Sequence, residues 1–161
     1  MDRIDDIDAR IVTMLQQQGR LKRNEIAEAV GLSVPAVSER MRKLEERGVI
    51  TGYHAVVSPK RLHLDVTVFI RVSVDSSQHF PAFVEKALAH PEVLEVHSIT
   101  GEGSHMLKVR TRSTTTLERL LATVQQWPGV RATSSSIVLS TFKETRAVAV
   151  SATPLYDPDA A

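Results

Sequence analysis

The sequence predicts an α+β protein of two domains: an N-terminal three-helix, winged-helix-like helix-turn-helix domain and a C-terminal ferredoxin-like βαββαβ domain. Apolar residues recur at helical spacing in three segments before residue 50, and they fill every second position from 64 to 74. Helical and strand patterns then follow in the order of a split βαβ sheet. We expect domains over residues 1–50 and 64–151, a linker strand over 51–63 and a flexible tail over 152–161.

The first predicted helix covers residues 5–18. Ile4, Ile7, Ile11 and Leu15 repeat at helical spacing, and Gly19 follows as a stop signal. One side of this helix is therefore expected to face a core.

A turn with a glycine joins the second and third predicted helices. The second covers residues 24–30 and ends at Gly31, which can adopt a left-handed conformation at low cost. Ser33 can cap the third helix, and Pro35 in its first turn removes no helical hydrogen bond. The third helix is expected to end near Arg47.

The third helix has an apolar stripe and a polar outer face. A last helix of this kind can enter the major groove of DNA, where Arg and Lys reach guanine edges or phosphates. Six basic and three acidic residues lie between Arg20 and Lys43. A solvated three-helix bundle without a DNA partner remains the other interpretation. The candidate DNA-binding residues are Lys22, Arg23, Ser33, Val34, Pro35, Ser38, Glu39, Arg40, Arg42 and Lys43.

The second half of the chain alternates strand and helix patterns. Turn residues separate these segments, among them Gly101-Glu102-Gly103 in a hairpin and Pro128-Gly129 after the second helix. Both helices should cover one face of a four-stranded antiparallel sheet, and its open face, with Phe69, suggests pairing of two subunits. We expect strands over 64–74, 93–100, 105–112 and 134–142, helices over 80–88 and 117–127, and a short extra strand over 147–150.

Motifs across the first sixty residues resemble one known family. Glu25-Ile26-Ala27, Val30-Gly31-Leu32-Ser33, Arg40-Met41-Arg42 and Gly48-Val49-Ile50, continuing to Tyr53 and Pro59, are similar to the Lrp/AsnC feast/famine regulators. The resemblance implies a sequence-specific transcriptional regulator that binds double-stranded DNA. It also implies a homodimer that can assemble into an octamer, and control by a small effector, an amino acid, bound between subunits. Lys22 departs from the small hydroxyl residue frequent in the family and is expected to contact phosphate.

The same resemblance implies an effector site at the hairpin. The segment from Gly101 to His105 aligns with the family pattern Gly-Asp-x-Asp-Tyr-hydrophobic, with Gly101 and Glu102 matching and Ser104 and His105 departing from it. Free N–H groups of a glycine turn can hold a carboxylate. The implied effector-binding residues are Gly101, Glu102, Gly103, Ser104, His105, Thr133 and Ser135.

Other classes of function find little support in the sequence. There is no cysteine, phosphate-binding loop or nucleophile with a base, so we expect no enzyme and no cofactor. A metal site would rest on His97 and His105 facing each other across the hairpin, and we expect none. The acidic N-terminus and the lack of a long apolar run favour a cytoplasmic protein without membrane contact. An architectural DNA-binding protein without an effector remains the alternative function.

Overall fold

The computed structural model describes residues 3–154, which form two compact units. Among these residues, the helical unit contains 3–56 and 144–154, and the sheet unit contains Val57–Lys143. No helix within residues 3–154 is long and apolar enough to cross a membrane.

The helical unit contains α1 (Asp6–Gln17), α2 (Arg23–Val30) and α3 (Val34–Glu46), as the apolar spacing predicted. Asp5 caps α1 by accepting from the N–H of Asp8, and Ser33 caps α3 by accepting from the N–H of Ala36. Gly31 ends α2 with a φ of 71°. Buried side chains from all three helices form one core: Ile11, Val12, Leu15, Ile26, Ala27, Val37, Met41 and Leu44.

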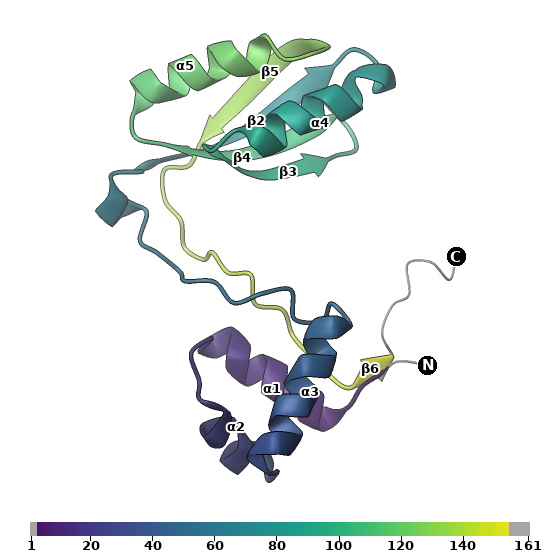
Figure 1. Ribbon diagram of the computed structural model, residues 1–161. Coiled ribbons are helices and arrows are strands. Elements are labelled where there is room, and N and C mark those ends of the chain that lie inside the picture. Colours follow the sequence, from purple (N-terminus) through teal and green to yellow (C-terminus); the bar gives the residue numbers. More distant parts are fainter. Residues whose placement is uncertain (1–2, 155–161) are drawn as a thin grey trace. The chain divides into compact units, whose positions relative to one another are not determined.

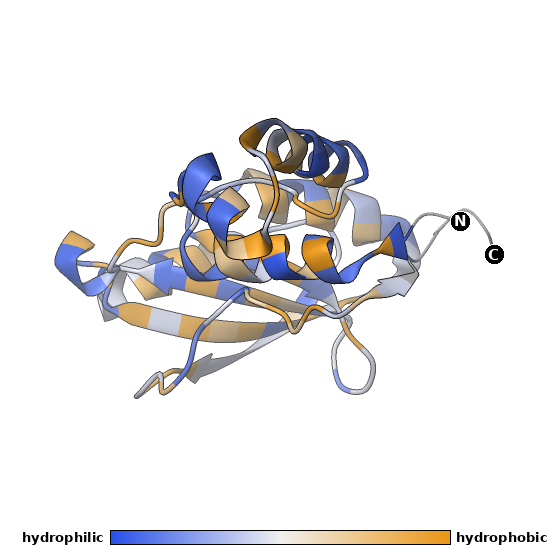
Figure 2. Cartoon of the chain, turned by 90° about the horizontal axis from the view of Figure 1, so that it is seen from below, coloured by the Kyte–Doolittle hydropathy of each residue, from blue (hydrophilic) through white to orange (hydrophobic). Residues whose placement is uncertain are grey.

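The sheet unit is the predicted ferredoxin-like βαββαβ fold. Its four antiparallel strands lie in the order β3-β4-β2-β5, and α4 and α5 lie on the same side of the sheet (Figure 1). Apolar and polar stretches alternate along its helices and strands (Figure 2), as expected of elements with one buried side. The elements are β2 (Val66–Val74), α4 (Phe80–Ala89), β3 (Val93–Ser98), β4 (His105–Thr111), α5 (Thr114–Gln125) and β5 (Val130–Ile137).

The core of the sheet unit lies between the sheet and the two helices. Val68, Ile70 and Val72 of β2 are fully buried there, whereas Phe69 on the other face is 40% exposed. The alternation in the sequence therefore gave the correct inner face. Helix and strand side chains complete the core, including Phe83, Ala87, Leu107, Val109, Leu117, Leu120, Val124 and Trp127.

The last strand begins earlier than the expected range of 134–142. It starts at Val130, directly after the turn at Gly129, where the N–H of Asp75 donates to the Gly129 carbonyl over 2.8 Å. From there the strand pairs with β2 as far as Ile137, which lies opposite Val68.

The segments on either side of the sheet unit also differ from expectation. Residues 51–58, expected as a linker strand, have no regular secondary structure, and η1 (Lys60–Leu62) is a single 3₁₀ turn. Residues 147–150 are not a strand either. A strand needs a neighbour to satisfy its backbone groups, and within the described chain neither segment has one.

Residues 144–154 belong to the helical unit rather than to the expected second domain and the start of the expected tail. β6 (Thr153–Pro154) pairs antiparallel with β1 (Arg3–Ile4), and Val150 packs against the helical core. Residues 155–161 of the expected tail lie outside the described residues.

Candidate DNA-binding face and effector hairpin

The outer face of α3 is polar except at its first turn. Val34 is 42% exposed, Pro35 is exposed, and Ser38 is half-buried. Glu39, Arg42 and Lys43 follow on the same helix and are all exposed. Except for Arg40, the α3 residues expected to contact DNA therefore reach solvent.

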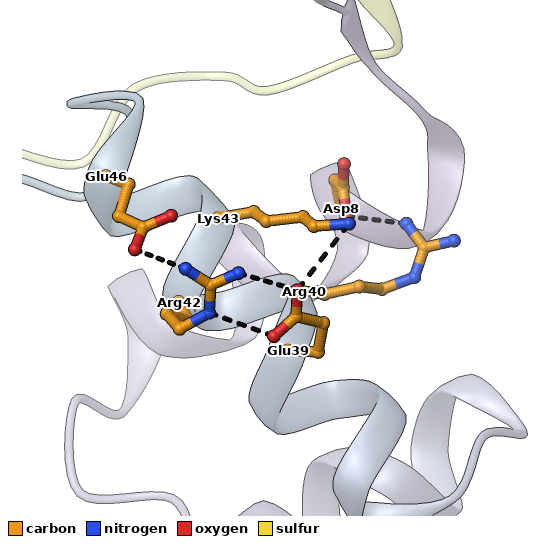
Figure 3. Close-up of polar contacts among 6 residues, drawn as sticks. All are labelled: Asp8, Glu39, Arg40, Arg42, Lys43 and Glu46. Atoms are coloured by element: carbon orange, nitrogen blue, oxygen red, sulfur yellow. Dashed lines mark hydrogen bonds and ion pairs between the residues drawn. The ribbon is translucent and has the colours of Figure 1, made fainter.

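Arg42 is the centre of an ion-pair network within α3 (Figure 3). Its Nε and one terminal nitrogen donate to the two carboxylate oxygens of Glu39 over 2.9 and 2.7 Å, and its other terminal nitrogen donates to Glu46. Lys43 Nζ lies 3.6 Å from Glu39. The hydrogen bond from Arg42 is the main reason why the pKa of Glu39 falls to about 2, and the Glu39 bond likewise raises the pKa of Arg42.

Arg40 occupies a different environment from its neighbours on α3. One terminal nitrogen lies 2.7 Å from Asp5 Oδ2 and 2.7 Å from Asp8 Oδ1, so the side chain joins α3 to the start of α1. Asp8 is buried, with 6% of the residue exposed. The hydrogen bonds that Arg40 donates to both carboxylates raise the pKa of Arg40. The structure thus turns Arg40, whose side chain is 31% exposed, toward α1, whereas Glu39, Arg42 and Lys43 pair with one another on the outer face of α3.

Lys22 and Arg23 lie at the start of α2, beside an open pocket of about 630 Å³. The backbone N–H of Lys22 donates to Glu25 Oε2 over 2.8 Å, and Lys22 as a residue is exposed. Tyr53 also lines this pocket, and its hydroxyl donates to Glu45 Oε1 over 2.9 Å. Burial and that hydrogen bond raise the pKa of Tyr53 to about 12. No local pattern predicts the Tyr53–Glu45 contact, because the contact depends on the path of the chain after α3.

The hairpin between β3 and β4 exposes its backbone at two glycines. Gly101 and Gly103 have φ angles of 90° and 78°, a region that favours glycine. Within the described chain, the N–H groups of Gly101, Glu102 and Gly103 make no hydrogen bond. A Cβ atom at Gly103 would lie 2.8 Å from Cγ of Arg71, so this glycine is also required by close packing.

Glu102 is the exposed side chain of the hairpin. Its side chain is 89% exposed, and Oε2 lies 3.3 Å from a terminal nitrogen of Arg71 on β2. Since Arg71 alternates with the buried Ile70 and Val72, this ion pair lies on the open face of the sheet.

Ser104 and His105 point back into the sheet unit. Ser104 Oγ accepts from the N–H of Val74 over 3.1 Å and donates to the carbonyl of Val72 over 3.3 Å. It also lies 2.9 Å from Nδ1 of His105, whose ring packs against Phe80 and Phe83. The ring is buried, which lowers the pKa of His105. These two residues fix the hairpin onto β2 and the core.

Thr133 and Ser135 lie on the helix-covered side of β5, because they pair with the buried residues Val72 and Ile70. Thr133 Oγ1 accepts from Gln125 Nε2 of α5 over 3.2 Å. They therefore do not share a face with Glu102 and Arg71 within one chain.

The two histidines considered as metal ligands lie on opposite faces of the sheet, which contradicts the facing arrangement. His97 pairs with Met106 and contacts Glu95, with 3.2 Å between Nε2 and Oε2. His105 is buried under the helices. In residues 3–154, no group of three or more His, Cys, Asp or Glu side chains could hold a metal ion.

Comparison with known proteins matches both units to described domains. Residues 4–51 match a winged helix-turn-helix DNA-binding domain, and residues 67–148 match the Lrp/AsnC ligand-binding domain.

Curated relatives match this chain over most of their own length. The uncharacterized HTH-type transcriptional regulator YezC of Bacillus subtilis is 46% identical over 120 residues, which cover 74% of this chain and 84% of that protein. The leucine-responsive regulatory protein of Escherichia coli is 31% identical over 153 residues, which cover 91% and 92%.

Solved structures agree with these matches. A transcriptional regulator of Neisseria meningitidis in complex with L-methionine superposes with a TM-score of 0.85 at 32% identity, covering 89% of this chain and 95% of that one. The feast or famine regulatory protein of Mycobacterium tuberculosis, also complexed with L-methionine, has a TM-score of 0.82 at 37% identity and covers 90% and 98%. The chain belongs to the Lrp/AsnC family of transcriptional regulators.

Proposed function

We propose that this regulator recognises operator DNA with the outer face of α3 and is regulated by an amino acid bound at the Gly101–Gly103 hairpin. The exposed row of Glu39, Arg42 and Lys43 on the last helix of the helix-turn-helix supports the first part. Ser33, Val34, Pro35 and Ser38 at the start of α3 provide further contacts with bases and sugars, and Lys22 and Arg23 bind phosphates.

The free N–H groups of the hairpin are the observation that supports an amino-acid effector. Three successive backbone donors without partners form a cradle that suits a carboxylate. The exposed carboxylate of Glu102 is the anionic group that the hairpin offers to an ammonium group. The L-methionine complexes of two relatives favour this function over an architectural role without an effector.

The other four residues expected in the effector site do not contact the ligand from the same subunit as the hairpin. Ser104 and His105 hold the hairpin in place and do not touch the ligand, because their side chains face β2 and the core. Thr133 and Ser135 lie on the other side of the sheet. They contribute to a bound effector only across a subunit boundary.

We further propose a homodimer formed through the open face of the sheet. Phe69 is 40% exposed there, next to Ser136 and Lys108 in the strand register. Pairing this face would bury the apolar ring and bring together two helix-turn-helix units for a two-fold symmetric operator. Dimers of this kind can assemble further into octamers.

Calorimetric titration of the twenty amino acids into the wild type and Gly101→Val tests the effector. L-Methionine or another amino acid should bind the wild type and not the variant, in which a β-branched residue would have to adopt a positive φ. No heat with any amino acid at millimolar concentration would instead support the architectural role.

A binding assay with promoter DNA tests the reading helix. Arg42→Ala should weaken operator binding by about 1–3 kcal/mol, the usual value of a bidentate base contact. Equal affinities of the wild type and this variant would show that α3 is not the reading helix.

A further inference from the structure

We propose that Glu39 and Glu46 are specificity-determining residues, which hold Arg42 away from the phosphates of arbitrary DNA and release it at an operator that can satisfy Glu39 in its place. This inference rests on the proposed role of α3 in reading DNA. It assigns a function to two acidic side chains on a surface that would otherwise be expected to attract a polyanion.

The geometry of the network leaves Arg42 largely occupied. Three of its N–H groups donate to carboxylates, two of them to Glu39 in a fork-to-fork arrangement. Glu39 precedes Arg42 by three residues and Glu46 follows it by four, so all three lie on one side of α3. Figure 3 shows the two carboxylates on either side of the guanidinium group.

The charges of this surface cancel. Arg42 and Lys43 are matched by Glu39 and Glu46, and Lys43 lies 3.6 Å from Glu39. Binding to arbitrary DNA is driven by cations that replace the counterions of the phosphates. A neutral surface supplies little of that driving force, and its carboxylates repel the phosphates that approach it.

The network has little to do with folding. The partners of Arg42 are on its own helix, and all three side chains are about half exposed: 52% for Arg42, 49% for Glu39 and 57% for Glu46. Exposed pairs of this type stabilise a helix only weakly. Arg40 shows the contrast, because it bonds the buried Asp8 and joins two helices.

A base pair can replace the hydrogen bonds of both Arg42 and Glu39, whereas a phosphate can replace only those of Arg42. Guanine offers two acceptors to Arg42, and the amino group of a neighbouring cytosine offers a donor to Glu39. At such a site both members of the pair find new partners. At a phosphate, Arg42 finds an acceptor while Glu39 loses its donor next to another negative charge, so the exchange is unfavourable.

The test compares Glu39→Gln and Glu46→Gln with Glu28→Gln, a matched control. Glu28 is an exposed acid on α2, so its substitution changes the net charge of the full-length protein by the same amount. Fluorescence anisotropy would measure binding to a random-sequence duplex of about 30 base pairs and to an operator selected with the wild type, between about 50 and 200 mM salt. Circular dichroism would verify that each variant is folded.

We expect Glu39→Gln to raise affinity for the random duplex about five- to tenfold and to steepen its salt dependence by about one unit of log–log slope. Affinity for the operator should rise less, so the ratio between the two should fall. Glu46→Gln should raise random-duplex affinity more than the control does, and Glu28→Gln should leave the ratio unchanged. The effect of Glu39→Gln should shrink in an Arg42→Ala background, because Glu39 acts through Arg42.

Two results separate this inference from the function on which it rests. If Arg42→Ala weakens operator binding but Glu39→Gln and Glu46→Gln match Glu28→Gln on the random duplex, the inference is overturned and the reading helix stands. If Arg42→Ala binds the operator as tightly as the wild type does, the proposed role of α3 in DNA recognition is itself contradicted.

Discussion

The side-chain amide of Gln16 on α1 bonds both backbone groups of Val148. Its Nε2 donates to the Val148 carbonyl over 3.0 Å, and the Val148 N–H donates to its Oε1 over 2.7 Å. These residues are 132 positions apart, and the sheet unit lies between them in the sequence. The chain that leaves β5 is therefore fixed to the DNA-binding unit, where Val150 packs on the core and β6 pairs with β1.

This contact predicts a difference between two neighbouring glutamines. Gln16→Ala should lower the free energy of unfolding of the helical unit by about 1 kcal/mol, because it removes two hydrogen bonds to the backbone. Gln17→Ala, the matched control on the exposed side of α1, should have no measurable effect. Urea denaturation followed by circular dichroism would measure both. Equal stability of the two variants would show that the returning segment contributes nothing.

Arg40 should behave as a structural residue and Arg42 should not. Arg40→Ala leaves the buried carboxylate of Asp8 without its cation, so we expect a loss of about 2 kcal/mol, less than for a fully buried pair because Arg40 is partly exposed. Arg42→Ala should unfold at nearly the same urea concentration as the wild type. The idea fails if the Arg40 variant is as stable as the Arg42 variant.

Substitution by alanine should lower the free energy of unfolding by different amounts at the two hairpin glycines. Gly103→Ala combines a positive φ with contacts of 2.8 and 3.0 Å to Arg71 and Val72, so a loss of about 2 kcal/mol is expected for the sheet unit. Gly101→Ala meets open space and should cost only the φ penalty, about 1 kcal/mol. Thermal unfolding would rank the two, and the reverse order would contradict the close packing at Gly103.

Burial of His105 should make the sheet unit sensitive to mild acid. Because burial lowers the pKa of His105 below its usual 6.5, the unfolded chain binds a proton at a higher pH than the folded chain does. The contribution of neutral, buried His105 to the free energy of unfolding is therefore fully present above pH 6.5. It is lost as the pH falls from 6.5 toward the lower pKa of the folded chain. His105→Phe should flatten the dependence of the melting temperature between about pH 7 and 5. Identical profiles for the wild type and this variant would show that His105 does not titrate in this way.

The dimer proposal predicts a change of mass. Phe69→Arg puts a charge in the centre of the open sheet face, so light scattering should show the full-length variant dissociating to monomers at micromolar concentration. Leu88→Arg is the control, because Leu88 is 72% exposed on α4, which packs on the other face of the sheet. Dissociation by the control alone would place the interface on the helices.

The sequence by itself determined the three helices of the helical unit and the order of helices and strands in the sheet unit, because these elements are set by local patterns. Helical spacing at Ile7, Ile11 and Leu15, and alternation from Leu64 to Val74, depend only on neighbours in the chain. Capping by Ser33 and the turn at Gly31 are equally local. The positions of the exposed residues on α3 and of the hairpin glycines followed from the same patterns.

The tertiary structure decided which way several polar residues face and which unit residues 144–154 join. Arg40 lies at the flank of the α3 stripe, and only the packing of α1 against α3 brings Asp5 and Asp8 within 2.7 Å of it. Ser104 turns inward because β2 offers a donor at Val74 and an acceptor at Val72. Residues 144–154 return to the helical unit through a glutamine and a two-residue strand 132 or more positions away. Such contacts join distant parts of the chain, so no local pattern predicts them. They form only in the folded protein, where buried polar groups need hydrogen-bond partners.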